Sequence, residues 1–186
     1  MMTAMRTERT TTRAVFGFAA GACALLLGYG YYLQYAQGLE PCPLCLVQRG
    51  FFYLVMGVSL LAALHGPGRV GTVIDAGLML LFAGGGAATA ARQVWLQHLP
   101  PEKVPQCGPD LFYMLDNLPL ARTLEKLFTG TGECAVVDWS FLGLSIAGWS
   151  LLWFVAFCAL ALWLALKRKS GSEPDFSFPE VDGKYR

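Results

Sequence analysis

Two cysteines separated by two residues are the part of this chain with the clearest capacity for chemistry. They lie in the stretch Glu40-Pro41-Cys42-Pro43-Leu44-Cys45, directly before a long apolar run. Such a pair can close a disulfide and reopen it, because one thiol acts as the leaving group while its neighbour resolves the mixed disulfide. Taken alone, the motif also fits half of a zinc site or a plain stapled turn. We interpret it as a redox pair because of its surroundings.

An arginine follows the second cysteine by four residues, so Cys45 and Arg49 share one face of the predicted helix. The unpaired N–H groups at the start of that helix favour an anion, and therefore a thiolate at Cys45. A cation one turn inside a membrane helix is costly and has a functional or pairing reason. We interpret Arg49 as part of the site, and a guanidinium that snorkels to the interface is the alternative.

The composition indicates a membrane protein. Hydrophobic residues make up 55% of the 186 residues and charged residues only 15%, which is too apolar for an ordinary soluble domain. The formal net charge of +1 offers no basic field for nucleic acid phosphates. We therefore expect the lipid bilayer as a partner and no nucleic acid.

Stretches long enough to cross a bilayer need about 20 mostly apolar residues. The chain contains four of them, at about 14–36, 46–64, 72–91 and 141–166. The sequence thus predicts an all-α membrane protein, a bundle of four transmembrane helices formed by residues 1–169 and followed by a polar tail, 170–186. A cleaved secretory signal fits the first run poorly, because the run is longer than a signal's apolar region and no small-x-small site closes it.

Lysine and arginine residues set the expected orientation. They gather before the first span, in the second connection and after the fourth span, so both termini and the tail are predicted to be cytoplasmic. The loops at about 37–45 and 92–140 then share the outer face. Within the long outer loop, apolar residues interspersed with polar ones between 110 and 128 predict a short helix in the membrane interface.

Four cysteines fall in the two outer loops: Cys42, Cys45, Cys107 and Cys134. Paired thiols on an outer face are typical of an oxidising compartment, although the sequence alone leaves three connectivities open. Cys107 lies among several prolines, in a segment that favours an exposed and labile disulfide over a static staple. Cys23 and Cys158 are mid-helix and are expected to behave as small apolar residues.

His98 lies near the outer end of the third span, where it could donate a hydrogen bond or a proton to a redox partner, or simply be a satisfied interfacial histidine. Two further functions compete with a redox enzyme. One is an adaptor held by two static disulfides, and the other is a metal-binding module that uses Cys42, Cys45 and His98. We expect no metal, because the acidic loop offers no second close pair of cysteines.

Several motifs follow one another in order along the chain. They are Pro41-Cys42-Pro43-Leu44-Cys45, Gln48-Arg49, Arg92-Gln93-Val94-Trp95-Leu96-Gln97-His98, Cys107-Gly108-Pro109, Gly132-Glu133-Cys134 and Trp139-Ser140-Phe141-Leu142-Gly143. Together they resemble the bacterial disulfide bond formation protein B family, DsbB. The resemblance covers the four spans and both outer loops.

The resemblance implies a bacterial inner-membrane oxidoreductase that reoxidises a soluble periplasmic thiol oxidase, DsbA, and passes the electrons to the membrane quinone pool. It implies the redox disulfides Cys42–Cys45 and Cys107–Cys134. The partner's thiolate would attack Cys107, and a disulfide between the two loops would form transiently. Cys45 and Arg49 would then lie against the quinone, and His98 is a further candidate. Ubiquinone is the family's aerobic default, and menaquinone is the alternative.

Overall fold

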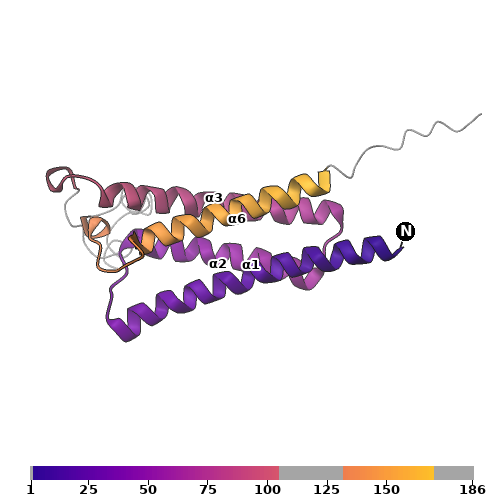
Figure 1. Cartoon of the computed structure of the whole chain (residues 1–186), viewed down its shortest axis with the longest axis horizontal. Coiled ribbons are helices and arrows are strands. Elements are labelled where there is room, and N and C mark those ends of the chain that lie inside the picture. Colours follow the sequence, from indigo (N-terminus) through magenta and orange to yellow (C-terminus); the bar gives the residue numbers. More distant parts are fainter. Residues whose placement is uncertain (1, 105–131, 170–186) are drawn as a thin grey trace, which may run out of the picture.

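Four long helices lie side by side in one bundle in the computed structural model, which describes residues 2–104 and 132–169 (Figure 1). They are α1 (Met2–Gln37), α2 (Pro43–His65), α3 (Arg69–Gln97) and α6 (Ile146–Lys169). Each contains a segment long and apolar enough to cross a membrane. The predicted four-helix membrane architecture is therefore confirmed.

Short elements gather at one end of the bundle. They are the 3₁₀ helices η1 (Pro101–Lys103) and η2 (Gly132–Ala135), and the strands β1 (Ser140–Phe141) and β2 (Leu144–Ser145). We call this end, where α2 also begins, the loop end. The N-terminus, the α2–α3 connection and the end of α6 lie at the opposite end (Figure 1).

The two ends of α2 are fixed by local chemistry. Cys42 is the N-cap, and its sulfur accepts a hydrogen bond from the backbone N–H of Cys45 at 3.4 Å. Pro43 occupies the first turn, where its missing N–H costs nothing. Gly66 ends the helix with a φ of 63°, a left-handed conformation that glycine adopts without strain, and its N–H bonds to Ala62 O at 3.0 Å. The cap thus places both cysteines at the loop end.

The core forms where α3 packs between α2 and α6, with α1 packed on α2. Phe52 of α2 and Phe154 of α6 stack with ring centroids 4.1 Å apart. Gly86 of α3 lies directly against the Phe154 ring, so close that a Cβ atom there would overlap it. Small residues at a helix crossing are a usual way for membrane helices to approach closely.

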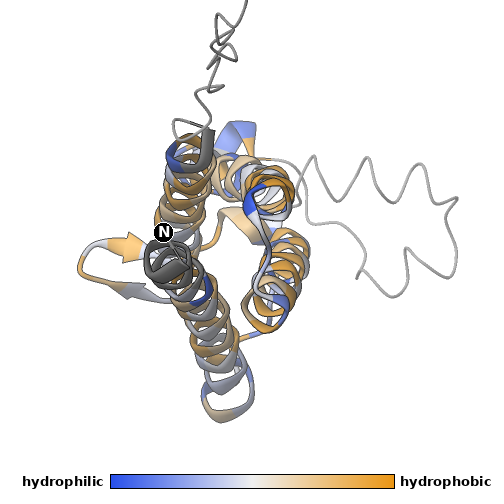
Figure 2. Ribbon diagram, turned by 90° about the vertical axis from the view of Figure 1, so that its right-hand side faces the viewer, coloured by the Kyte–Doolittle hydropathy of each residue, from blue (hydrophilic) through white to orange (hydrophobic). Residues whose placement is uncertain are grey.

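The two predicted boundaries on either side of the long outer loop differ from the structure. The third span was expected to end near residue 91, but α3 continues to Gln97, so residues 92–97 are helical and not part of the outer loop. The fourth span was expected to begin at residue 141, but residues 140–145 form an antiparallel hairpin that projects from the side of the bundle (Figure 2). Its turn, Leu142-Gly143, has φ of 52° and 79°, as a two-residue hairpin turn with two left-handed residues requires.

Some predictions fall outside the described residues. The interfacial helix expected between residues 110 and 128, the tail at 170–186 and Cys107 all lie there. They stay predictions.

Gly86→Ala should destabilise the bundle. The added methyl group meets the Phe154 ring, which is fully buried and stacked on Phe52, so the ring has no free direction in which to move. Overpacking of this kind costs about 1–3 kcal/mol. We expect a lower midpoint of thermal unfolding for the protein in detergent.

Gly84→Ala is the matched control, because nothing lies within 4 Å of a Cβ atom at that position of the same helix. Its midpoint should equal or slightly exceed that of the parent protein, since alanine favours helix over glycine. Equal midpoints for the two variants would contradict the packing assigned to Gly86.

Candidate functional site

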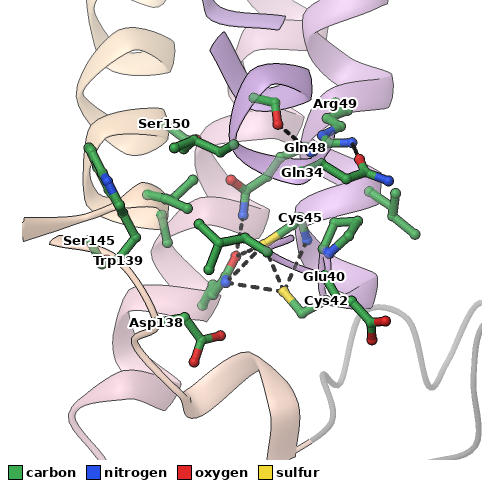
Figure 3. Close-up of a pocket in the computed structure, with 18 of the residues that line it drawn as sticks. Gln34, Glu40, Cys42, Cys45, Gln48, Arg49, Asp138, Trp139, Ser145 and Ser150 are labelled. Atoms are coloured by element: carbon green, nitrogen blue, oxygen red, sulfur yellow. Dashed lines mark hydrogen bonds between the residues drawn. The ribbon is translucent and has the colours of Figure 1, made fainter. Parts of the chain in front are cut away.

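The sulfurs of Cys42 and Cys45 lie 2.7 Å apart at the start of α2 (Figure 3). Cys42 precedes the helix as its N-cap, and Cys45 stands in the first turn. Both side chains are half-buried, and each is a free thiol. The N-terminus of α2 therefore presents a hydrogen-bonded dithiol next to the positive end of a helix dipole, which favours negative charge on sulfur.

A third sulfur, from a residue that follows the long loop in sequence, lies beside this pair. Cys134 lies in η2, which packs against α3 and α2, and its side chain is fully buried beside Leu44 and Leu96. Its thiol is hydrogen-bonded to that of Cys42. Cys42, Cys45 and Cys134 are hereafter called the sulfur site. Sequence reasoning named all three cysteines but did not predict that Cys134 meets Cys42.

The contacts of Cys42 change the pKa of its thiol. The hydrogen bond to Cys134, then the hydrogen bond to Cys45, and then burial all raise the pKa of the Cys42 thiol far above its usual range. Cys42 therefore keeps its proton at neutral pH, and that proton can be donated to a neighbouring sulfur. The arrangement suits a site in which one sulfur of the pair holds a proton while the other carries charge.

A buried pair of amides completes the surroundings of the dithiol. Gln93, near the end of α3, donates from Nε2 to the sulfurs of Cys42 and Cys45, at 3.2 Å each. Gln48 donates from Nε2 to Gln93 Oε1 at 2.7 Å. Sequence analysis gave neither glutamine a role. The available signal was their polarity: Gln48 lies three residues after Cys45 in an apolar span, and Gln93 lies at the start of the predicted outer loop.

A cavity of about 500 Å³ opens beside the sulfur site. Its wall combines Cys42, Cys45 and Arg49 with apolar side chains from α1, α2 and α6, among them Leu26, Leu27, Leu33, Phe52 and Ile146. Arg49 is held against α1, where its guanidinium donates to Gln34 Oε1 at 2.5 Å and to Gly30 O at 3.1 Å and lies 4.8 Å from the Tyr31 ring centroid. The cavity wall therefore combines apolar side chains with two sulfurs, the Arg49 cation and further polar groups, among them the carboxylates of Glu40 and Asp138 (Figure 3).

The hairpin closes the cavity on the side of α6. Trp139 and Ser145 line it, and Ser145 Oγ donates to Gln97 Oε1 at 2.7 Å, which ties the hairpin to the end of α3. The rings of Trp139 and Phe141 stack, with centroids 6.1 Å apart. The segment expected to be the first turn of a helix thus serves as a wall of the cavity.

His98 lies at the C-terminal cap of α3 and is exposed. One ring nitrogen, Nδ1, is 2.8 Å from Val94 O, and the side chain is not among those that line the cavity. Its role next to a redox partner stays a prediction. Cys23, by contrast, is fully buried in the apolar core, as expected for a small apolar residue.

Comparison with known proteins agrees with this geometry. The family model described as "Disulfide bond formation protein DsbB" matches residues 12–164. The chain belongs to the DsbB family. Among relatives named "Disulfide bond formation protein B", the one from Azoarcus sp. is 49% identical over 91% of this chain and 99% of its own length. The relative from Aromatoleum aromaticum is 47% identical over 90% of this chain and all of its own length.

Membership in the DsbB family confirms the resemblance seen in the sequence. It identifies this chain as a multi-pass membrane protein of disulfide bond formation, with the disulfide oxidoreductase activity that the family implies. The matched range includes all four cysteines of the two outer loops. Three of these four cysteines meet in the sulfur site of the described structure.

The acidity of Cys42 should depend on Cys134. In the reduced protein, Cys42 should react with iodoacetamide only at strongly alkaline pH, because its thiol keeps its proton in hydrogen bonds with neighbouring sulfurs. Cys134→Ala removes the largest cause of the raised pKa, so the midpoint of the pH–rate profile should fall by roughly one unit or more. Peptide mass spectrometry measures the modification of Cys42.

Cys158→Ala in α6 is the control, because this thiol belongs to the apolar core and does not contact Cys42. Its profile should match that of the parent protein. A Cys134→Ala profile that also matches would show that Cys134 does not hydrogen-bond Cys42 in solution.

Proposed function

We propose that this protein is a quinone-dependent thiol oxidase of the bacterial inner membrane, which reoxidises a periplasmic DsbA-like dithiol protein and passes the electrons to a membrane quinone. One observation carries the proposal. Three sulfurs meet at the loop end, and two of them, those of Cys42 and Cys45, lie on the wall of a cavity that also contains Arg49. Neither a static disulfide staple nor a metal module accounts for a cavity of this kind.

The residues around the cavity fit a quinone. Apolar side chains suit the ring and the start of a lipid tail, and a volume of about 500 Å³ lies within the usual range of small-molecule sites. Arg49 has five N–H donors, of which contacts to Gln34 and Gly30 occupy two, so others are available to a quinone carbonyl. A bound quinone supplies an acceptor for two electrons and two protons.

The order of the sulfurs supports a route for the electron pair. The partner's thiolate attacks Cys107, breaks the Cys107–Cys134 bond and leaves Cys134 as a thiolate. Cys134 then attacks Cys42, since these two sulfurs are in contact, and the Cys42–Cys45 bond breaks. The electron pair of that bond stays on Cys45, which lies at the cavity wall in the first turn of α2. A second partner thiolate releases Cys107 and leaves the partner oxidised. The Cys107 thiolate then attacks Cys134 and breaks the Cys42–Cys134 bond, which restores the Cys107–Cys134 disulfide and leaves Cys42 and Cys45 as a reduced pair whose two electrons would pass to the quinone.

Energetics favour a quinone over other acceptors. A DsbA-type dithiol has a reduction potential of about −120 mV, which a glutathione pool cannot recharge. A more oxidising acceptor is therefore needed. Ubiquinone meets this need in our proposal, and menaquinone is the alternative.

The charge distribution supports the orientation. Arg13, Arg69 and Lys167 lie towards the end of the bundle opposite to the loop end, and positive residues favour the cytoplasmic side. In this proposal both termini are cytoplasmic and the sulfur site faces the periplasm. That side is the oxidising compartment in which a DsbA-like partner is found.

Quinone turnover tests the proposal. Purified protein with a reduced DsbA-like partner should bleach the ring absorbance of added ubiquinone, and Arg49→Ala should raise the KM for quinone roughly tenfold, because a hydrogen bond to a charged group contributes about 1.5–3 kcal/mol. The KM for the partner protein should change little, since Arg49 is on the cavity wall.

Arg92→Ala is the control, because Arg92 lies on α3 over the Trp95 ring and does not line the cavity. Both KM values should stay at those of the parent protein. Absence of turnover with every quinone would refute the proposed function, whereas an unchanged KM for quinone in Arg49→Ala would leave Arg49 as an interfacial anchor.

A further inference from the structure

A single buried carboxamide touches both sulfurs of the dithiol. Gln93 is only 4% exposed, and its Nε2 lies 3.2 Å from Cys42 Sγ and 3.2 Å from Cys45 Sγ. It belongs to the last part of α3, which packs against α2, and it is 48 residues from Cys45 in sequence. Nothing in the electron route described above requires this contact, so it calls for its own explanation.

The orientation of the Gln93 amide is fixed by a second buried glutamine. Gln48, 3% exposed, donates from Nε2 to Gln93 Oε1 at 2.7 Å, so the oxygen faces Gln48 and the NH₂ group faces the sulfurs. The one contact of the opposite kind, from the Cys45 thiol to Gln93 Oε1, is longer at 3.6 Å. The pair of amides therefore presents N–H donors to sulfur.

N–H donors distinguish the two redox states of the pair. Reduction adds two electrons to the Cys42–Cys45 bond and leaves two separate sulfurs, one protonated and one charged when a single proton is taken up. A charged sulfur accepts hydrogen bonds far more strongly than a disulfide sulfur, and burial strengthens the difference because the surroundings screen charge poorly. An amide aimed at the sulfurs thus stabilises the reduced pair more than the oxidised pair.

We propose that Gln93 is a positioning residue that makes the Cys42–Cys45 disulfide more oxidising by stabilising its reduced state, and that Gln48 holds the Gln93 amide in the orientation this requires. The inference rests on the proposed function in that the pair must cycle between disulfide and dithiol. The role proposed for Gln93 adds a reason why the electron pair passes readily from Cys134 to the Cys42–Cys45 pair. A disulfide whose reduced form is stabilised is the stronger oxidant.

The test is the equilibrium of the full-length protein with glutathione in detergent free of quinone and partner. Two glutathione thiols reduce the Cys42–Cys45 disulfide and leave as glutathione disulfide, and acid quenching, alkylation and peptide mass spectrometry give the reduced fraction of this pair. Gln93→Met, similar in shape but without donors, should shift the equilibrium about tenfold towards the disulfide, which is about 30 mV for a two-electron couple.

Two further variants separate this effect from simple damage. Gln93→Met leaves the Gln48 amide without its partner, whereas the double variant Gln48→Met with Gln93→Met removes both groups, which is much less disruptive than removing one. The double variant should unfold at nearly the parent temperature yet keep the tenfold shift. Thr89→Val, which removes a buried hydroxyl one turn earlier on α3, should leave the equilibrium within twofold of the parent value.

Three results would overturn the proposal: an unchanged equilibrium in Gln93→Met, an equal shift in Thr89→Val, or a parent-like equilibrium in the double variant. Because the measurement uses neither quinone nor partner, its outcome is independent of the turnover assay. A protein that fails to reduce quinone can still show the glutathione shift, and a true quinone reductase can lack it.

Discussion

The contact between Cys134 and Cys42 is the interaction on which the rest of the site depends. It joins a residue after the long loop to the cap of α2, so that Cys134 meets the Cys42–Cys45 pair although the two are far apart in sequence. Burial of Cys134 between Leu44 and Leu96 excludes water from this sulfur and holds η2 against the bundle. Without this packing, Cys42 and Cys45 would be an isolated dithiol at a helix end.

Helix packing within the bundle determines the position of the polar groups around this contact. Helix α3 packs against α2 and α6 along its length, and Gly86 allows the Phe154 ring to approach it closely. Because α3 is one continuous helix to Gln97, that crossing also sets where Gln93 meets the sulfurs and where Gln97 holds the hairpin. Packing in the apolar middle of the protein is thus linked to the geometry of polar groups at the loop end.

Hydropathy predicted the four helices, because each span must satisfy its backbone hydrogen bonds within an apolar run. It failed where polar side chains find partners inside the protein. Gln93 and Gln97 made the end of α3 look like a loop, but both are bonded to other residues and the helix continues. At the other extreme, the apolar residues Phe141 and Leu142 looked like the start of a span, although the left-handed turn at Leu142-Gly143 makes a hairpin.

Only part of the site could be predicted from the sequence, namely the part that lies on one helix. Spacing along one helix links Cys42, Cys45 and Arg49, so their proximity follows from the sequence alone. The approach of Cys134 and of Gln93 depends on tertiary packing between separate segments, which no local pattern encodes. Residues that act across helices therefore emerged only from the structure.

The meeting of Cys42 and Cys134 is the central claim, and a cross-link tests it most directly. In membranes containing the protein with Cys45→Ser and Cys107→Ser, mild oxidation should join Cys42 to Cys134 in most molecules, as peptide mass spectrometry would show, because their thiols are already in contact. Recovery of both residues as separate thiols under the same conditions would contradict the account.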